Sequence, residues 1–344
     1  MKSFVDYAVQ QIINLCNIPS PSGFTRRIEE YLFNEFTKLG YKPTFTNKRA
    51  ILIDLGGEGN GLVLAAHVDT LGAMVRSIKP NGRLRLSKIG SFPENYIETE
   101  NCVIHTRTGK EYSGTIQIEK SSVHVYSTTD ITEVKRDDTN VEVVIDEKVK
   151  SKDDVKKLEI NSGDFVTFDS RTVYTKSGFI KSRHLDDKAS SAVLIALAKY
   201  IKDKNIKLNR KVYLMFTTYE EVGHGASSAI PEDVKEMVSV DMGAVGDDLE
   251  TDEFKVSICA KDSNGPYNYD ITNKFIALAK QKNLNYAVDI YPYYGSDVGA
   301  ALIAGYDLKH GLIGPGIASS HGYERTHYEG IENTLILIKE YVVS

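Results

Sequence analysis

Apolar positions along the first 70 residues predict two helices followed by two strands. In residues 26–40 the apolar side chains recur at helical spacing. Residues 50–55 and 61–69 then form two apolar runs, and the second run is nearly unbroken, as is typical of a strand buried on both faces of a sheet. This strand ends in His67 and Asp69. In open α/β sheets, chemistry is typically located at the carboxyl ends of the strands.

The pattern changes between about residue 75 and residue 175. Short alternating runs are separated there by Gly, Asn, Asp and Ser, which predicts a small, mostly β domain. A polar stretch at residues 146–160 predicts one short exposed helix, and its charges are typical of a solvated face.

Beyond Arg183, helices again alternate with apolar strands. Helices are predicted at 188–201, 268–283 and 332–342, and strands at 211–218, 236–243, 254–260 and 286–292. This alternation predicts an α/β fold, a mixed sheet flanked by helices on both faces. We therefore predict a discontinuous catalytic domain of residues 1–74 plus 176–344, with a β-rich domain of residues 75–175 inserted into it.

The composition favours a soluble, cytoplasmic protein that acts on small solutes. The 344 residues carry a net charge of −5 without a long basic block, which gives no reason to expect nucleic acid or a membrane as partner. No apolar run approaches the roughly 18 to 20 residues that cross a bilayer, and residues 1–16 have the periodicity of a first helix rather than a signal peptide. Cys16, Cys102 and Cys259 lack the spacing of a disulfide framework or a zinc site.

Side chains of the types that bind metal ions follow several of the predicted strands. They are His67 and Asp69, Asp186, Glu220 and Glu221, Asp241, and His321. Single acidic or histidine residues occur by chance in any chain of this length. Five separate positions of ligand type at strand ends predict a metal site.

Two of these positions have simpler explanations when each is taken alone. Residues two apart on a strand share a face, so Asp69 could accept a hydrogen bond from one imidazole N–H of His67 and turn the other nitrogen toward a metal. A plain hydrogen-bonded pair explains the same motif. Asp186 and Asp187 precede a strong helical pattern, where one carboxylate, most naturally that of Asp187, is expected to be an N-cap.

The later positions repeat the arrangement of an apolar strand followed by acid and glycine. Glu220 and Glu221 are adjacent, so their side chains diverge and can serve a metal and a water separately. Asp241 follows the next strand. His321 and His327 are close together beyond it, and spacing alone does not choose between them.

Two different roles are expected for the remaining histidines. His184 and His224 are close enough in sequence to the proposed site to line it. Structural or surface roles are favoured for His105, His124 and His310.

The chain resembles metallopeptidase family 42, the tetrahedral glutamyl, lysyl and leucyl aminopeptidases with two co-catalytic metals. The resemblance lies in the ordered segments AHVDTLG, LDDKAS, EEVGHGAS, VDMG and SHGYE, together with PSPSGF and GSDVGA. It spans almost the whole chain, and the order and spacing are far more specific than any one motif.

This resemblance implies an aminopeptidase that hydrolyses the N-terminal residue of short peptides through a metal-bridging water. It implies two divalent metal ions per subunit, zinc or cobalt, with manganese as a third candidate. By matching position, His67 and Asp241 would bind the first ion, Glu221 and His321 the second, and Asp186 both. Asp69 would orient His67, and Glu220 would be the general base and then the general acid.

The resemblance also implies a homo-oligomer, from dimer to dodecamer, with the inserted domain making dimer contacts. Three positions depart from the family pattern. Thr70 stands where an acidic residue is common, Lys188 where arginine is common, and His224 where an aliphatic residue is common. All of the implied ligands are intact, so these departures bear on substrate preference rather than on metal binding.

Three other functions are weighed against this one. A two-metal carboxypeptidase or deacylase on a related fold would carry its insertion after the glutamate pair, whereas here the β-rich insertion precedes Glu220. A glycoside hydrolase using Glu220 and a second carboxylate has no need for the accompanying histidines. A noncatalytic binding protein has no need for a complete ligand set with an additional glutamate.

Overall fold

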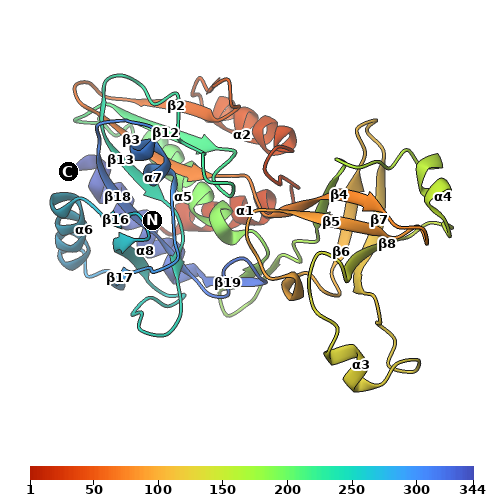
Figure 1. Cartoon of the computed structure of the whole chain (residues 1–344). Helices are drawn as coiled ribbons and strands as arrows, with labels where there is room; N and C mark the ends of the chain where they lie inside the picture. The colour runs from red at the N-terminus through yellow and green to blue at the C-terminus, as the bar shows by residue number, and fades with distance from the viewer. The chain divides into compact units, whose positions relative to one another are not determined.

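The computed structural model describes residues 1–344 and divides into two compact units (Figure 1). The first unit, Met1–Thr70 plus Arg171–Ser344, is built around a ten-stranded mixed sheet. Its strands are β1 (Thr44–Phe45), β2 (Ile51–Gly56), β3 (Gly61–His67), β12 (Val212–Thr217), β13 (Val234–Val240), β14 (Gly243–Ala244), β15 (Val256–Asp262), β16 (Gly265–Pro266), β17 (Tyr286–Ile290) and β18 (Lys309–Ile317). The order is β1-β2-β12-β3-β13-β18-β15-β16, with β14 paired to β18 and β17 to β15. Since β12, β3, β13 and β18 are parallel, their carboxyl ends meet at one edge.

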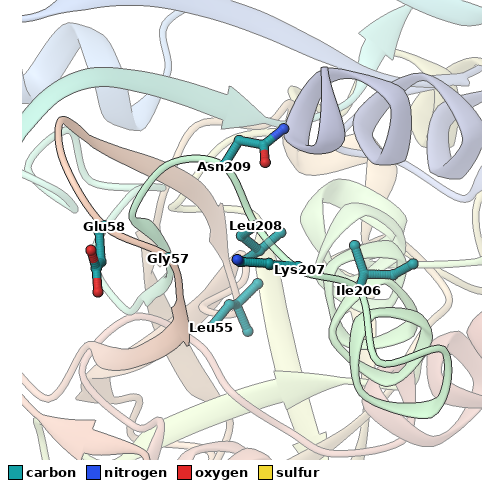
Figure 2. A pocket seen from close by; sticks show the side chains of 7 residues that line it. All are labelled: Leu55, Gly57, Glu58, Ile206, Lys207, Leu208 and Asn209. Carbon is teal, nitrogen blue, oxygen red and sulfur yellow. The ribbon is translucent and has the colours of Figure 1, made fainter.

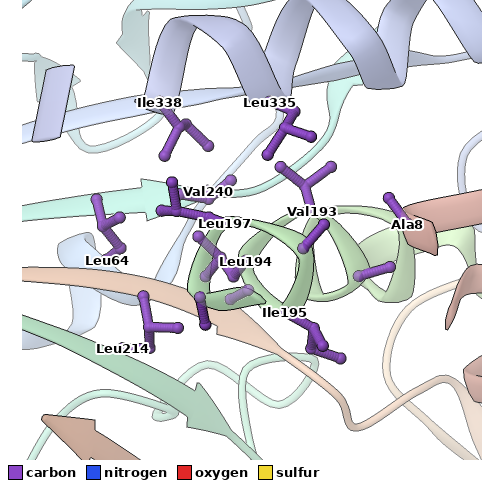
Figure 3. Close-up of a cluster of buried hydrophobic side chains, with 14 of the residues drawn as sticks. Ala8, Leu64, Val193, Leu194, Ile195, Leu197, Leu214, Val240, Leu335 and Ile338 are labelled. Carbon is purple, nitrogen blue, oxygen red and sulfur yellow. The ribbon is translucent and has the colours of Figure 1, made fainter. Parts of the chain in front are cut away.

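Long helices cover one face of this sheet. They are α1 (Lys2–Cys16), α2 (Arg26–Lys38), α5 (Leu185–Asp203), α6 (Tyr269–Gln281) and α8 (Tyr328–Val343). The central helix α5 is apolar on nearly all sides because it lies between the sheet and other helices. Figure 3 shows Val193 and Leu197 of α5 among Leu64 of β3 and Leu335 of α8.

The opposite face of the sheet has its own core. Leu62 and Leu64 of β3 belong to the cluster under the long helices, whereas Val63 and Ala65 pack with Val298 of the short helix α7 (Asp297–Ile303). Alternation along β3 therefore fills both faces with apolar side chains. The predicted fold class, a mixed sheet with helices on both faces, is confirmed.

A small antiparallel sheet accompanies the large one in the same unit. It consists of β10 (Val173–Tyr174), β11 (Phe179–Ser182) and β19 (Glu324–His327) in that order. Ser182 of β11 pairs with Glu324 of β19. This pairing joins the segment just before α5 to the segment just after the His321 loop.

The second compact unit is Leu71–Ser170, a closed barrel with the strand order β4-β5-β8-β7-β6-β9. Its elements are β4 (Gly72–Ile78), β5 (Leu84–Ile89), the 3-10 helix η1 (Glu94–Tyr96), β6 (Asn101–His105), β7 (Glu111–Ile118), α3 (Thr128–Thr132), β8 (Val141–Ile145), α4 (Lys152–Lys157) and β9 (Phe165–Phe168). Barrel closure leaves no free strand edge. The helix α4 confirms the short helix predicted within residues 146–160.

Strand β18 and helix α7 were not predicted. Glycine and proline interrupt the apolar pattern of β18, so that its sequence resembles a loop. The glycines have a packing reason, since a Cβ on Gly314 would lie 1.9 Å from the backbone oxygen of Asp241. The close approach brings the end of β13 against β18, where the Asp241 N–H donates to the carbonyl of Ile313 at 3.0 Å.

No helix in the structure combines the length and the apolar character that a membrane crossing requires.

Candidate metal centre

The carboxyl ends of three parallel strands bring the acidic and histidine residues together. β3 ends at His67, which pairs in register with Thr217 at the end of β12. Glu220 and Glu221 follow β12, and Asp241 follows β13 directly. The turn after each strand can then carry polar side chains without interrupting the buried ladder.

His67, Asp186 and Asp241 form one group of possible metal ligands. One ligand atom from each lies within 4.8 Å of the others, and all three residues are buried. The Nε2 atom of His67 is 3.0 Å from Oδ1 of Asp186. Asp186 reaches this position because its backbone is not helical, although it lies at the start of α5.

Asp186 also faces a second group. Its Oδ2 atom is 3.4 Å from Nε2 of His321, and the same nitrogen is 3.8 Å from Oε2 of Glu221. The two carboxylate oxygens of Asp186 are thus directed to different histidines. This is the arrangement of a ligand shared by two sites.

Glu220 lies beside the first group without belonging to it. Its Oε2 atom is 3.7 Å from Nε2 of His67. Glu220 also lines a cavity of about 200 Å³, whose other lining residues are Gly223, Gly225, Asn264, Gly295, Ser296, Asp297, Ala300 and Ile303. The carboxylate therefore faces both the ligand cluster and a space that can hold part of a substrate.

Asp69 contacts His67 differently from the prediction. The Nδ1 atom of His67 is 3.0 Å from the backbone oxygen of Asp69 and 3.7 Å from its Oδ1 atom. The buried carboxylate instead accepts hydrogen bonds from the Ser22 hydroxyl at 2.5 Å, the Glu220 N–H at 3.1 Å and the Glu221 N–H at 3.3 Å. Asp69 thereby holds the backbone of the glutamate pair as well as lying against His67.

Burial and mutual repulsion shift the pKa values of this cluster. Burial, with the nearby Asp186 carboxylate, raises the pKa of Asp241 to about 7. Burial and neighbouring carboxylates also raise the pKa of both Glu220 and Glu221. For Asp186 burial acts in the same direction, but contacts with His321 and His67 outweigh it and lower the pKa.

These donors fit divalent metal ions. Carboxylate oxygens and imidazole nitrogens are the ligands that zinc and similar ions prefer, and buried carboxylates that repel one another need a counter-charge. His67, Asp186 and Asp241 would hold one ion, and Asp186, Glu221 and His321 a second.

The structure separates the two histidines that spacing left open. His321 faces the cluster, whereas Nδ1 of His327 accepts a hydrogen bond from the Glu329 N–H at the start of α8. Nε2 of His327 lies 2.8 Å from the backbone oxygen of Ser177. His327 is therefore a helix cap and not a ligand of the cluster.

The structure also places His184 and His224, which were expected to line the site, and Asp187. His184 occupies the N-cap position of α5 with φ +68°, and exposed His224 stacks on Tyr219 at 5.0 Å. The expected N-cap role of Asp187 is wrong. No side chain caps α5, and Oδ2 of Asp187 accepts instead from the His67 N–H at 3.3 Å because the first turn is not helical.

Two residues at the site were not singled out from the sequence. Ser22 holds the Asp69 carboxylate from the PSPSGF segment. Glu324 accepts hydrogen bonds from the backbone N–H groups of Asp186 and His321. Both residues act through the backbone or through another side chain, so they do not belong to a pattern of metal-ligand spacing. The one signal in the sequence was that Glu324 lies three residues after His321.

A larger hollow, of about 570 Å³, lies elsewhere in this unit (Figure 2). Its lining residues are Leu55, Gly57, Glu58, Ile206, Lys207, Leu208 and Asn209. Leu55 lies in β2, and the others belong to the loops that follow β2 and precede β12, at the edge of the sheet opposite His67. The lining has one carboxylate and no histidine, so it offers no comparable ligand set.

A mixed sheet with carboxylates and histidines gathered at its carboxyl edge defines an α/β protein with a candidate metal centre. The chain belongs to the M42 glutamyl aminopeptidase family, whose sequence model matches residues 50–337. It is therefore an aminopeptidase, a hydrolase of peptides.

A curated relative agrees with this membership, and solved structures match the fold. The chain is 44% identical over 338 residues to the Bacillus subtilis (strain 168) protein named "Putative aminopeptidase YhfE", with 98% of this chain and 97% of that protein covered. Its fold matches aminopeptidase APDkam598 from the archaeon Desulfurococcus kamchatkensis with a TM-score of 0.86 at 20% identity, over 98% of this chain and 95% of that one. Pyrococcus horikoshii TET1 peptidase matches with a TM-score of 0.85 at 22% identity, over 98% and 99%.

Proposed function

We propose that the chain removes the N-terminal residue of short peptides with two divalent ions, held by His67, Asp186 and Asp241 and by Asp186, Glu221 and His321. The observation that carries the proposal is the position of Asp186, whose Oδ1 atom is 3.0 Å from His67 and whose Oδ2 atom is 3.4 Å from His321. Zinc and cobalt are the proposed ions, because the donor set is mixed nitrogen and oxygen.

Bound ions supply a Lewis acid for the scissile carbonyl and a water of lowered pKa. The chain's own contribution to proton transfer is Glu220. Its carboxylate takes a proton from the attacking water and delivers it to the leaving nitrogen. The hydrogen bonds from the Glu220 and Glu221 N–H groups to Asp69 orient the two adjacent side chains, one toward the reacting atoms and one toward the ligand cluster.

Chelation tests this function. Purified protein is assayed on aminoacyl chromogenic substrates before and after chelation, and then with zinc, cobalt or manganese added back. Activity should disappear on chelation, return with metal and require a free amino terminus. Activity on the same substrates that survives complete removal of metal would contradict the proposal.

The cavity beside Glu220 supports a preference against acidic N-terminal residues. A peptide whose first carbonyl lies near Glu220 would direct its first side chain into this cavity. The lining contains two carboxylates, Glu220 and Asp297, and no lysine, arginine or histidine. Asp297 is fixed by the Thr217 hydroxyl at 2.6 Å and the Ala226 N–H at 2.8 Å, so it cannot turn away from an incoming charge.

We therefore expect uncharged and basic N-terminal residues to be cleaved with a higher kcat/KM than glutamate or aspartate. Two like charges about 4 Å apart repel by about 1 to 4 kcal/mol in a partly solvated site, which corresponds to a factor of about five or more. The measurement is kcat/KM for alanyl, leucyl, lysyl and glutamyl substrates with the same leaving group. A preference for the glutamyl substrate would refute this use of the cavity while leaving the aminopeptidase intact.

A positive charge introduced into the cavity lining tests the same preference directly. Asn264 lines the cavity with an exposed side chain, so Asn264→Lys should raise the glutamyl rate relative to the leucyl rate. Asn209→Lys adds the same charge to the hollow at the opposite edge of the sheet, and it should leave the ratio unchanged.

We also propose a homo-oligomer assembled through the barrel of residues 71–170. Pyrococcus horikoshii TET1 peptidase "can assemble into a tetrahedron or a large octahedral shell", and the present fold covers 99% of that chain. A monomeric mass by light scattering of the full chain would contradict this proposal.

A further inference from the structure

Glu324 is the buried carboxylate nearest to the backbone of two proposed ligands. Its Oε2 atom accepts a hydrogen bond from the Asp186 N–H at 3.1 Å, and its Oε1 atom accepts one from the His321 N–H at 2.8 Å. The residue is 1% exposed, so water does not compete for these contacts. Each oxygen therefore serves one ligand residue.

Both ligand residues lie in irregular backbone that needs such a partner. His321 has φ +64°, and Asp186 has non-helical dihedral angles at the start of α5. Outside a helix or a strand ladder, a buried N–H has no partner unless a side chain or a loop carbonyl supplies one. Glu324 itself lies in β19, where it pairs with Ser182 of β11. A regular strand thus positions the acceptor for two irregular segments that are distant in sequence.

Asp69 makes a matching set of contacts on the other side of the cluster. Its carboxylate accepts from the N–H groups of Glu220 and Glu221, as that of Glu324 accepts from those of Asp186 and His321. Two buried carboxylates therefore hold the backbone of four residues that we place at the site. Only Asp69 had been assigned a role from the sequence.

We propose that Glu324 is a positioning residue that fixes Asp186 and His321 and thereby sets the affinity for the ion held by Asp186, Glu221 and His321. This inference rests on the proposed two-ion function. Loss of the anchor releases His321 and one side of Asp186, whereas His67 and Asp241 keep their own supports: a carbonyl contact from Asp69 and a backbone hydrogen bond to β18. The effect should therefore fall mainly on one of the two ions.

Glu324→Gln tests the assignment with little change in volume. Glutamine keeps one carbonyl oxygen but replaces the other oxygen with an NH₂ group, so one of the two backbone N–H groups loses its acceptor. Removal of a partner that orients a ligand typically costs about 10- to 100-fold in metal affinity. We expect the ion held by Asp186, Glu221 and His321 to lose affinity by about this factor and the other ion to change by less than about threefold.

The matched control is Asp289→Asn. Asp289 is also buried and also accepts from two backbone N–H groups, those of Glu250 and Thr251 at 2.9 Å each. The same chemical change there disturbs a comparable anchor away from the ligand residues. Glu324→Asp is a further variant, which keeps the charge and both acceptor oxygens but shortens the reach, and it should lose less affinity than Glu324→Gln.

Metal-free protein is titrated with Co²⁺ against a competing chelator, and the visible absorption of bound cobalt is recorded together with thermal unfolding of the metal-free chain. The proposal is supported if only the Glu324 variants lose one ion and alter the cobalt spectrum while Asp289→Asn binds as wild type does. It is overturned if Glu324→Gln binds both ions with wild-type affinity and spectrum, or if both variants lose binding equally. Wild-type protein that binds one ion or none would instead count against the two-ion function itself.

Discussion

Glu220→Gln is expected to lower kcat for peptide hydrolysis by about 10²- to 10⁴-fold, the usual contribution of a positioned general base. The amide can neither take a proton from water nor return one to the leaving nitrogen. Metal content should stay at the wild-type value, because Glu220 is not among the residues assigned as ligands and is absent from the group formed by His67, Asp186 and Asp241. Steady-state kinetics and elemental analysis of the same preparation measure the two quantities.

A matched control is Glu232→Gln, an exposed glutamate in the loop between β12 and β13. It should leave both kcat and metal content unchanged. If Glu220→Gln retains a wild-type kcat with both ions bound, another group carries the proton and the assignment of Glu220 is wrong.

Asp186→Ala is expected to abolish both metal binding and hydrolysis. Both carboxylate oxygens are directed at proposed ligands of different ions, so one substitution removes a ligand from each site. Polarisation by metal ions contributes several kcal/mol, and each 1.4 kcal/mol or so is a factor of ten, so we expect activity to fall by at least about 10³-fold. Metal content after dialysis and residual kcat/KM are the measurements.

His321→Ala provides the comparison, because His321 is assigned to one ion only. This variant should retain about one ion per chain, bound mainly by His67, Asp186 and Asp241, as metal affinity depends on the number of ligands. Two ions bound at wild-type affinity in Asp186→Ala would rule out a shared ligand at this position.

The proposed side-chain preference differs from the one that the family description names. The family is described as glutamyl aminopeptidases, yet the space beside Glu220 has no basic residue in its lining. Membership in a family establishes the reaction class, whereas side-chain preference depends on the walls of one cavity. The Asn264→Lys variant asks whether a single charge at those walls is enough to change that preference.

Some of the site was readable from residue types and order. Apolar runs followed by His67, Glu220 and Asp241 predict strand ends, and parallel strands bring such ends to one edge. The choice between His321 and His327 was not readable, because both follow β18 within ten residues. It depends on the turn at Ser319–Gly322 and on β19, which leaves His321 near Asp186 and sends His327 to the start of α8.

The sequence by itself determined the fold class and the family, and it supplied the residues that we propose as metal ligands. These depend on local periodicity and on the order of motifs, both of which one chain contains. Only the tertiary structure decided that the Asp69 carboxylate holds the Glu220 and Glu221 backbone, that each oxygen of Asp186 faces a different histidine, and that Glu324 anchors Asp186. These contacts join loops that are far apart in sequence. Because nearly every residue has a backbone N–H, the residue type at the donor position does not reveal such a hydrogen bond.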